Sequence, residues 1–264
     1  MDTSLSRSPI KDKPLRFPGQ SVQESIDELL WDSTAPWIAL AAVSLILAGV
    51  EWFAVLRHLP RQPWLYTGLA AVATFYAAAK LARVRARIKR LKLGRDGEVY
   101  VGQYLERLRA GGADVFHDVP GEGFNIDHVV LSVHGFYAIE TKTRSKPARG
   151  NARITLTDAG ILVNGHRPER DPLVQVQAGA RWLARLLEDS TGEPFGVRGV
   201  VLYPGWFVEP MSAAWRRSAD KPWVLEPKAL PAFIEHEVTR VAETDVKLAA
   251  YHLARYVRST AALT

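Results

Sequence analysis

The chain of 264 residues has a formal net charge of +6, and 47% of its residues are hydrophobic, which is typical of a folded protein with one or two domains. It contains no cysteine, which excludes disulfide frameworks, thiolate nucleophiles and iron–sulfur centres and leaves oxygen and imidazole as metal ligands. The positive charge favours an anionic partner, although much of this charge directly follows a long apolar segment.

The N-terminal third of the chain predicts a membrane anchor. Residues 1–34 are polar and lack the basic, apolar and small-residue order of a cleavable signal peptide, so we expect a disordered tail. The apolar runs at 36–56 and 63–79 have lengths suited to crossing about 30 Å of hydrocarbon as helices. We therefore predict a transmembrane helical hairpin over residues 35–82.

The charges that flank the two apolar runs predict their orientation. Eight lysine and arginine residues lie between Lys80 and Arg95, whereas the link between the runs holds two arginines and one histidine. Because positive flanks stay in the cytoplasm, we expect a two-span protein of the cell membrane with its N-terminus and residues 95–264 in the cytoplasm. The basic stretch at 83–94 is interpreted as a juxtamembrane linker that contacts anionic lipid, with direct nucleic-acid contact as the alternative.

Residues 95–264 have the alternating pattern of a soluble α/β domain. Apolar spacing predicts a helix over 95–109, and Asp171 with Pro172 is typical of the start of another helix, which extends to about residue 188. Strands are predicted at 125–133, 136–143, 154–156, 161–163 and 197–203, with further helices near 230–241 and 245–258. The link at 205–227 is predicted to be irregular. This order favours a mixed sheet flanked by helices.

The segment 125–143 contains the residues that point to chemistry. If residues 134–135 form a tight hairpin loop, Asp127 lies opposite Lys142, and Glu140 lies diagonally across on the same face. Ionised groups on a partly apolar strand face are costly unless they are paired or bind metal. Two carboxylates that hold Mg²⁺ or Mn²⁺, beside a lysine, are suited to phosphodiester hydrolysis. The alternative is a surface ion pair between Asp127 and Lys142.

Two more polar residues are candidates for the same site, because each lies in an otherwise apolar helix segment. Glu98 is on the apolar face of the predicted helix at 95–109, although an acidic residue in a first turn is also favoured by the helix dipole. Gln175 has apolar neighbours and needs a buried partner. His128 points away from the face of Asp127 and is interpreted as a packing residue.

Four blocks of sequence resemble, in order and spacing, the nuclease-related domain family, NERD, which is assigned to the restriction-endonuclease-like superfamily. The blocks are G-R-D-G-E at 94–98, I-D-H-V-V-L-S at 126–132, G-F-Y-A-I-E-T-K at 135–142 and D-P-L-V-Q at 171–175. The resemblance extends over roughly Gly94 to Pro210. It implies a restriction-endonuclease-like α/β fold, a mixed sheet flanked by helices, behind the transmembrane hairpin.

The resemblance also implies a role for each of five residues. Asp127 and Glu140 would be the metal ligands, and Lys142 would be the catalytic lysine. Glu98 would be an accessory acidic residue, and Gln175 would be a polar residue that supports the site. The chain departs from the family at Thr143, where asparagine is frequent, and at Lys146 and Pro147, which replace a glycine-containing turn. These departures concern substrate contacts more than metal binding.

Three functions are compatible with the sequence. The first is a membrane-anchored nuclease that uses Mg²⁺ or Mn²⁺ to hydrolyse phosphodiester bonds, in DNA, at the cytoplasmic face. The second is a non-catalytic module that binds nucleic acid or a protein at the membrane. The third is a structural membrane protein. The first is favoured because all five motif residues are present. Arg144, Lys146 and Arg149 follow the site and are interpreted equally well as phosphate contacts or as a solvated basic loop.

Overall fold

The structure, a computed structural model, describes residues 15–57, 63–146, 152–237 and 240–260. The chain forms two compact units. One unit is Ser21–Leu93, and the other joins Met1–Gln20 with Gly94–Thr264. Gly94 lies one residue before position 95, where the sequence predicts the soluble domain to start.

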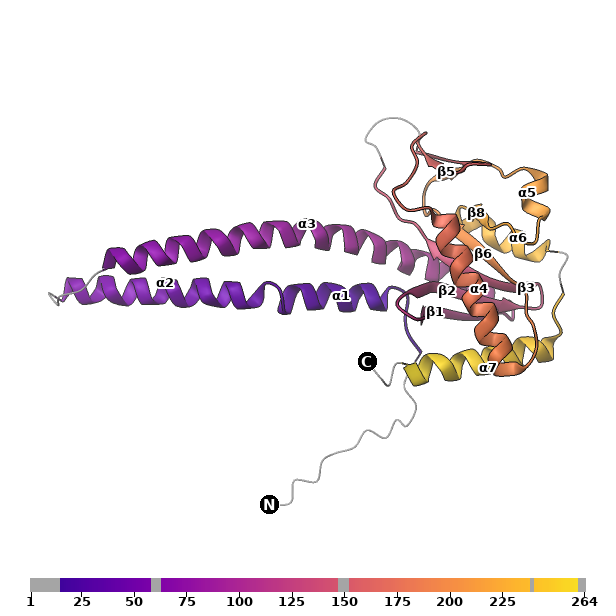
Figure 1. Ribbon diagram of the computed structural model, residues 1–264, viewed down its shortest axis with the longest axis horizontal. Coiled ribbons are helices and arrows are strands. Elements are labelled where there is room, and N and C mark those ends of the chain that lie inside the picture. The colour runs from indigo at the N-terminus through magenta and orange to yellow at the C-terminus, as the bar shows by residue number, and fades with distance from the viewer. Residues whose placement is uncertain (1–14, 58–62, 147–151, 238–239, 261–264) are drawn as a thin grey trace, which may run out of the picture. The chain divides into compact units, whose positions relative to one another are not determined.

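The Ser21–Leu93 unit consists of long helices, labelled in Figure 1. It contains most of α1 (Gln20–Trp31), α2 (Ala35–Leu56) and the first part of α3 (Pro63–Ala110). α2 contacts α3 through Trp52, whose Nε1 donates a 2.9 Å hydrogen bond to Thr67 and whose ring meets Trp64 edge-on. Large apolar side chains remain exposed on both helices. Two helices are therefore long and apolar enough to cross a membrane.

The helical unit differs from the sequence-based prediction in two places. Residues 20–31 form α1, so the predicted disorder is wrong for that part of the tail, where the buried Ile26 lies on an amphipathic helix. The predicted linker at 83–94 is also helical, because α3 continues without a break from Pro63 into the second unit. The apolar run, the basic stretch and the predicted helix at 95–109 are thus one helix.

The second unit is built on a five-stranded mixed sheet with the order β1-β2-β3-β6-β8. β1, β2 and β3 are antiparallel neighbours, whereas β6 and β8 run parallel to β3. Their bounds are Asp114–Pro120, Asn125–Ser132, Gly135–Thr141, Val197–Leu202 and Trp223–Leu225. A smaller sheet has the order β5-β4-β7, with β4 at Arg153–Thr157, β5 at Gly160–Val163 and β7 at Phe207–Val208.

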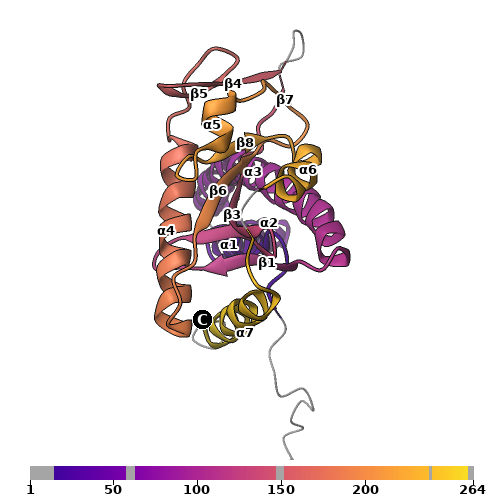
Figure 2. The ribbon, with the colours of Figure 1, turned by 90° about the vertical axis from the view of Figure 1, so that its right-hand side faces the viewer.

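Helices cover both faces of the large sheet, as Figure 2 shows. α4 (Pro172–Thr191) and α7 (Glu243–Thr260) pack on one face, against Val129 and Phe136. The last turns of α3 and the short α6 (Leu230–Glu235) pack on the other face, against Val130 and Tyr137. The remaining elements are α5 (Ala213–Arg217) and the 3₁₀ turn η1 (Pro227–Ala229). The predicted mixed α/β fold is confirmed.

Several elements escaped the sequence-based prediction. The segment 113–124 had no assignment and contains β1, an outer strand of the large sheet. The link at 205–227, predicted to be irregular, contains β7, α5 and β8. The helix predicted at 230–241 ends at Glu235.

The segment Leu15–Gly19, which precedes the apolar helices in sequence, is part of the sheet-containing unit. Arg16 Nε donates a 2.8 Å hydrogen bond to Asp118 of β1, and the two side chains are only 9% and 4% exposed. Pro18 packs so closely on α3 that a Cβ at Gly102 would lie 2.5 Å from its ring. This segment is therefore folded and not a free tail.

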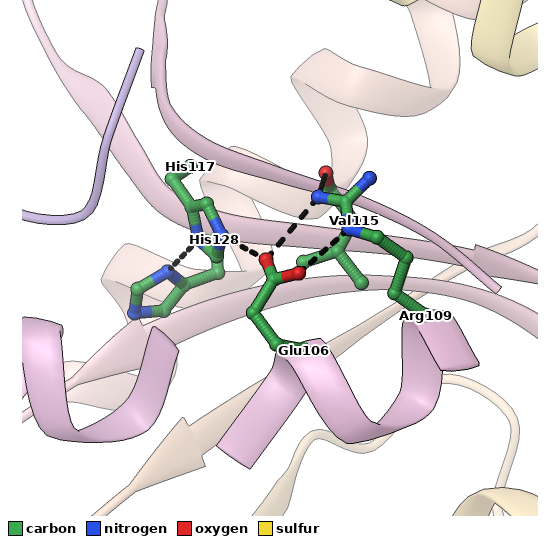
Figure 3. A network of polar contacts seen from close by, with 5 residues as sticks. All are labelled: Glu106, Arg109, Val115, His117 and His128. Carbon is green, nitrogen blue, oxygen red and sulfur yellow. Dashed lines mark hydrogen bonds and ion pairs between the residues drawn. The ribbon is translucent and has the colours of Figure 1, made fainter. Parts of the chain in front are cut away.

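Two histidines are paired on the sheet face that α3 covers, as Figure 3 shows. The Nδ1 atoms of His117 and His128 are 2.9 Å apart, and His117 Nε2 lies 3.1 Å from the carboxylate of Glu106. Burial lowers the pKa of His117 and lowers that of His128 further below its usual range. One neutral ring thus donates a hydrogen bond to the other. His128 lies on the face opposite Asp127, as the strand alternation predicts.

Candidate active site

The β2–β3 hairpin turns one residue earlier than predicted. Its last pair is Ser132 with Gly135, so the loop is 133–134 and not 134–135. The Ser132 hydroxyl fixes this turn, because it accepts a hydrogen bond from the His134 amide and donates one to the Gly135 carbonyl. Gly135 has φ of +123°, a conformation that favours glycine.

The earlier turn corrects the predicted pairing of Asp127 with Lys142. When the observed ladder is continued by one pair beyond His128 and Ile139, Asp127 lies opposite Glu140. The pairing has shifted by two residues, so all three side chains keep the predicted face of the sheet. The two carboxylates are therefore direct cross-strand neighbours and not diagonal ones, which brings them closer than predicted.

Glu140, Lys142 and Gln175 form a closed triangle of hydrogen bonds. Lys142 Nζ donates to Glu140 Oε1 at 2.5 Å and to Gln175 Oε1 at 2.9 Å. Gln175 Nε2 donates to the same oxygen of Glu140 at 2.7 Å. Gln175 is in the first turn of α4, which begins as predicted with Asp171 as the N-cap. The buried partner that Gln175 was expected to need is thus Glu140.

Asp127 is held by the backbone of the next strand. Its Oδ2 accepts a 2.7 Å hydrogen bond from the Thr141 amide. Within the described ranges, neither Oδ1 of Asp127 nor Oε2 of Glu140 has a hydrogen-bond partner. Two neighbouring carboxylates therefore each keep one oxygen available for a ligand.

Glu98 reaches the same region from α3, and its side chain is buried. Its approach depends on the preceding Gly97, where a Cβ would lie 1.6 Å from the hydroxyl oxygen of Thr143. The helix α3 and the segment that follows β3 are so close here that only glycine fits at this position. The hydroxyls of Thr141 and Thr143 are buried, and neither finds a partner among the described residues.

The three acidic side chains of the site all have raised pKa values. Burial, followed by the charges of Asp118 and Glu140, raises the pKa of Glu98 to about 7. Burial, followed by the charges of Glu140 and Glu98, holds the pKa of Asp127 well above its usual range. Burial also raises the pKa of Glu140, although the contacts with Lys142 and Gln175 oppose this rise. The positive charge of Lys142 offsets the negative charge of these carboxylates only in part, and a divalent cation would offset the remainder.

The donor set determines which metal fits. Across the part of the chain that the structure describes, no group of three acidic or histidine side chains surrounds a common metal position. The available ligands are Asp127 and Glu140, each with one open oxygen. Mg²⁺ commonly uses one or two carboxylates and completes its shell with water and phosphate oxygens. These residues therefore fit Mg²⁺ or Mn²⁺ better than zinc, which prefers nitrogen and sulfur ligands.

The basic residues that follow the site have different surroundings. The Arg144 carbonyl accepts a 3.2 Å hydrogen bond from Nε1 of the buried Trp206. This contact, which the sequence did not indicate, ties the end of β3 to the small-sheet region. Lys146 is exposed, whereas Pro147 and Arg149 lie outside the described residues.

Residues 93–204 match the family model of the nuclease-related domain. No curated protein and no solved structure matches the chain. The matched segment begins one residue before Gly94, the start of the longer part of the sheet-containing unit, and it includes Glu98, Asp127, Glu140, Lys142 and Gln175. It leaves out β8, α6 and α7, which complete the two layers of the fold.

Proposed function

Because residues 93–204 match the nuclease-related domain family, NERD, we propose that this chain is a metal-dependent nuclease anchored to a membrane. The observation that supports this function best is the pair of neighbouring carboxylates, Asp127 and Glu140, beside the hydrogen-bonded Lys142. Each carboxylate has one open oxygen, and burial raises the pKa of both. These are features of acidic groups that are suited to bind a cation.

Each side chain has a chemical task in this proposal. Asp127 and Glu140 hold Mg²⁺ or Mn²⁺, which when bound polarises the scissile phosphate and lowers the pKa of a water. Lys142 directs its ammonium group to the phosphate and offsets the negative charge that develops there. Gln175 keeps Lys142 and Glu140 in a fixed relative position, because it bonds to both. Glu98, with its pKa near 7, can accept a proton at neutral pH.

We also propose DNA as the substrate and the cytoplasmic face as the location. The positively charged stretch that follows the second apolar run supports this orientation. Arg144, Lys146 and the basic residues of α3 around Arg90 provide positive charge that can attract a polyanion. Anionic lipid remains the other partner proposed for the stretch at 83–94.

The test is cleavage of labelled DNA by the full chain in detergent or nanodiscs, with Mg²⁺ or with a chelator. The full chain is needed because Leu15–Gly19 belongs to the fold of the sheet-containing unit. Glu140→Gln and Lys142→Met should each reduce cleavage by about 100-fold or more, whereas Asp158→Asn, in the β4–β5 turn, should not. Cleavage that persists in both site variants would overturn the assignment. Salt-sensitive DNA binding that survives chelation, with no product, would favour the non-catalytic module.

A further inference from the structure

A pocket of about 250 Å³ lies beside the candidate site, between α4 and the strands β2 and β3. Glu140 and Gln175 are among its lining residues, so it reaches one of the two neighbouring carboxylates. Its other walls are largely apolar and include Ile126, Ala138 and Gly179. Pockets for drug-sized ligands usually measure about 300–1,000 Å³, so this one suits a single small ring system.

An aromatic side chain, Phe124, is fixed at this pocket. The Gly121 amide donates a 2.7 Å hydrogen bond to the Phe124 carbonyl, which closes a tight turn between β1 and β2. The ring lies directly over Gly121, where a Cβ would come within 2.7 Å of it. Its edge contacts Trp182 at a centroid distance of 5.4 Å, yet 39% of Phe124 is exposed. A stacking surface is thus held in place before any ligand arrives.

We propose that this pocket binds one unpaired nucleobase, next to a phosphate at Asp127 and Glu140, so that the substrate is single-stranded or locally unpaired nucleic acid. The inference rests on the proposed function and specifies its substrate class. The apolar walls and the neighbouring Glu140 carboxylate disfavour a phosphate inside the pocket, whereas a flat base can stack on Phe124. A base within an intact duplex cannot enter, because it must first leave the stack.

A substitution at Gly179 can close the pocket without disturbing the fold. A Cβ there would meet Ile126 at 3.5 Å, which is ordinary contact, and alanine is favoured over glycine inside a helix. Gly179→Ala should therefore keep or raise the unfolding temperature, and Gly179→Leu should fill the pocket. Phe124→Ala removes the stacking surface instead. Tyr251→Ala is the matched control, because this aromatic residue is 64% exposed and lies on α7, outside the pocket.

The experiment measures fluorescence anisotropy of the full chain with labelled oligothymidylate and with a duplex of equal length, in Ca²⁺ to suppress cleavage. We expect wild type to prefer the single strand. Phe124→Ala and Gly179→Leu should weaken single-strand binding by about 5- to 150-fold and leave duplex binding unchanged. Tyr251→Ala should leave the binding of both ligands unchanged. Equal wild-type affinity for both ligands, or variants that weaken both alike, would overturn the proposal.

The two proposals fail in distinguishable ways. If wild type cleaves DNA with Mg²⁺ while Phe124→Ala and Gly179→Leu bind and cut like wild type, the base pocket is wrong and the nuclease stands. If wild type binds the single strand but cuts no nucleic acid, and both variants lose that binding, the base pocket stands and the nuclease proposal is wrong.

Discussion

Glu98→Gln is expected to stabilise the metal-free chain, because a buried acid is removed from a cluster of like charges. Burial and the charges of Asp118 and Glu140 raise the pKa of Glu98 to about 7, compared with 4.5 in an exposed glutamate. In such a case the folded state binds the proton more tightly than the unfolded state does. The group therefore favours folding at low pH, and that contribution is lost as pH rises from about 4.5 through 7.

The size of the effect follows from the two pKa values of Glu98. A rise from 4.5 to about 7 makes the ionised group cost about 3 kcal/mol at pH 7 and about 1 kcal/mol at pH 5. In a domain of this size, 1 kcal/mol moves the unfolding midpoint by about 2–4 °C. Glu98→Gln should thus raise the midpoint by about 6–12 °C at pH 7 and by about 2–4 °C at pH 5.

The assay is thermal unfolding of the full chain in detergent, followed by near-ultraviolet circular dichroism at pH 5 and pH 7 with a chelator. Asp96→Asn is the control, because this neighbour of Glu98 is 64% exposed. Adding Mg²⁺ should raise the midpoint of wild type more than that of Glu98→Gln. A variant that is no more stable than wild type at pH 7, or that gains as much at pH 5, would refute the electrostatic reasoning.

Three further substitutions test other parts of the structure. Arg16→Ala removes the guanidinium from the buried Asp118 carboxylate, which keeps its hydrogen bond from Asn125, and should cost about 1–3 kcal/mol in the free energy of unfolding; denaturant titration should show a smaller loss when Asp118→Asn is added. His128→Leu should reduce the loss of stability below about pH 6.5, because burial lowers the pKa of His128 and the unfolded chain takes up the proton first; melts at pH 5 and pH 7 measure this. Gly97→Ala places a Cβ against Thr143 and should cost about 1–3 kcal/mol or more; an unchanged melting temperature would contradict the close contact.

The faces of β2 and β3 could be predicted from the sequence, but their register could not. Apolar residues at every second position, such as Phe136 and Ala138, determine which side chains face α4. A shift of two residues preserves this alternation, so the pattern alone does not distinguish the two pairings. The hydroxyl of Ser132 distinguishes them through local hydrogen bonds with the turn.

β1 was missed because its polar residues are satisfied by distant parts of the chain. Its sequence, D-V-F-H-D-V-P, combines apolar residues with Asp118 and His117, both of which are buried. Asp118 pairs with Arg16, 102 residues away in sequence, and His117 contacts Glu106 of α3. The sequence of β1 alone shows polar side chains whose burial is costly. The partners that offset this cost come from segments that only the tertiary structure brings close. The candidate site was easier to predict because its carboxylates and lysine lie within one hairpin.

The charge balance of the candidate site depends on segments that lie on both sides of the apolar helices in sequence. Arg16 precedes those helices and pairs with Asp118, whose charge raises the pKa of Glu98. Glu98 follows them on α3, and its charge in turn raises the pKa of Asp127. Displacing Leu15–Gly19 would expose the charge of Asp118, and shifting α3 would move Glu98 itself. Because charges in a poorly solvated region act strongly on one another, either change would alter the pKa of Asp127 without touching it.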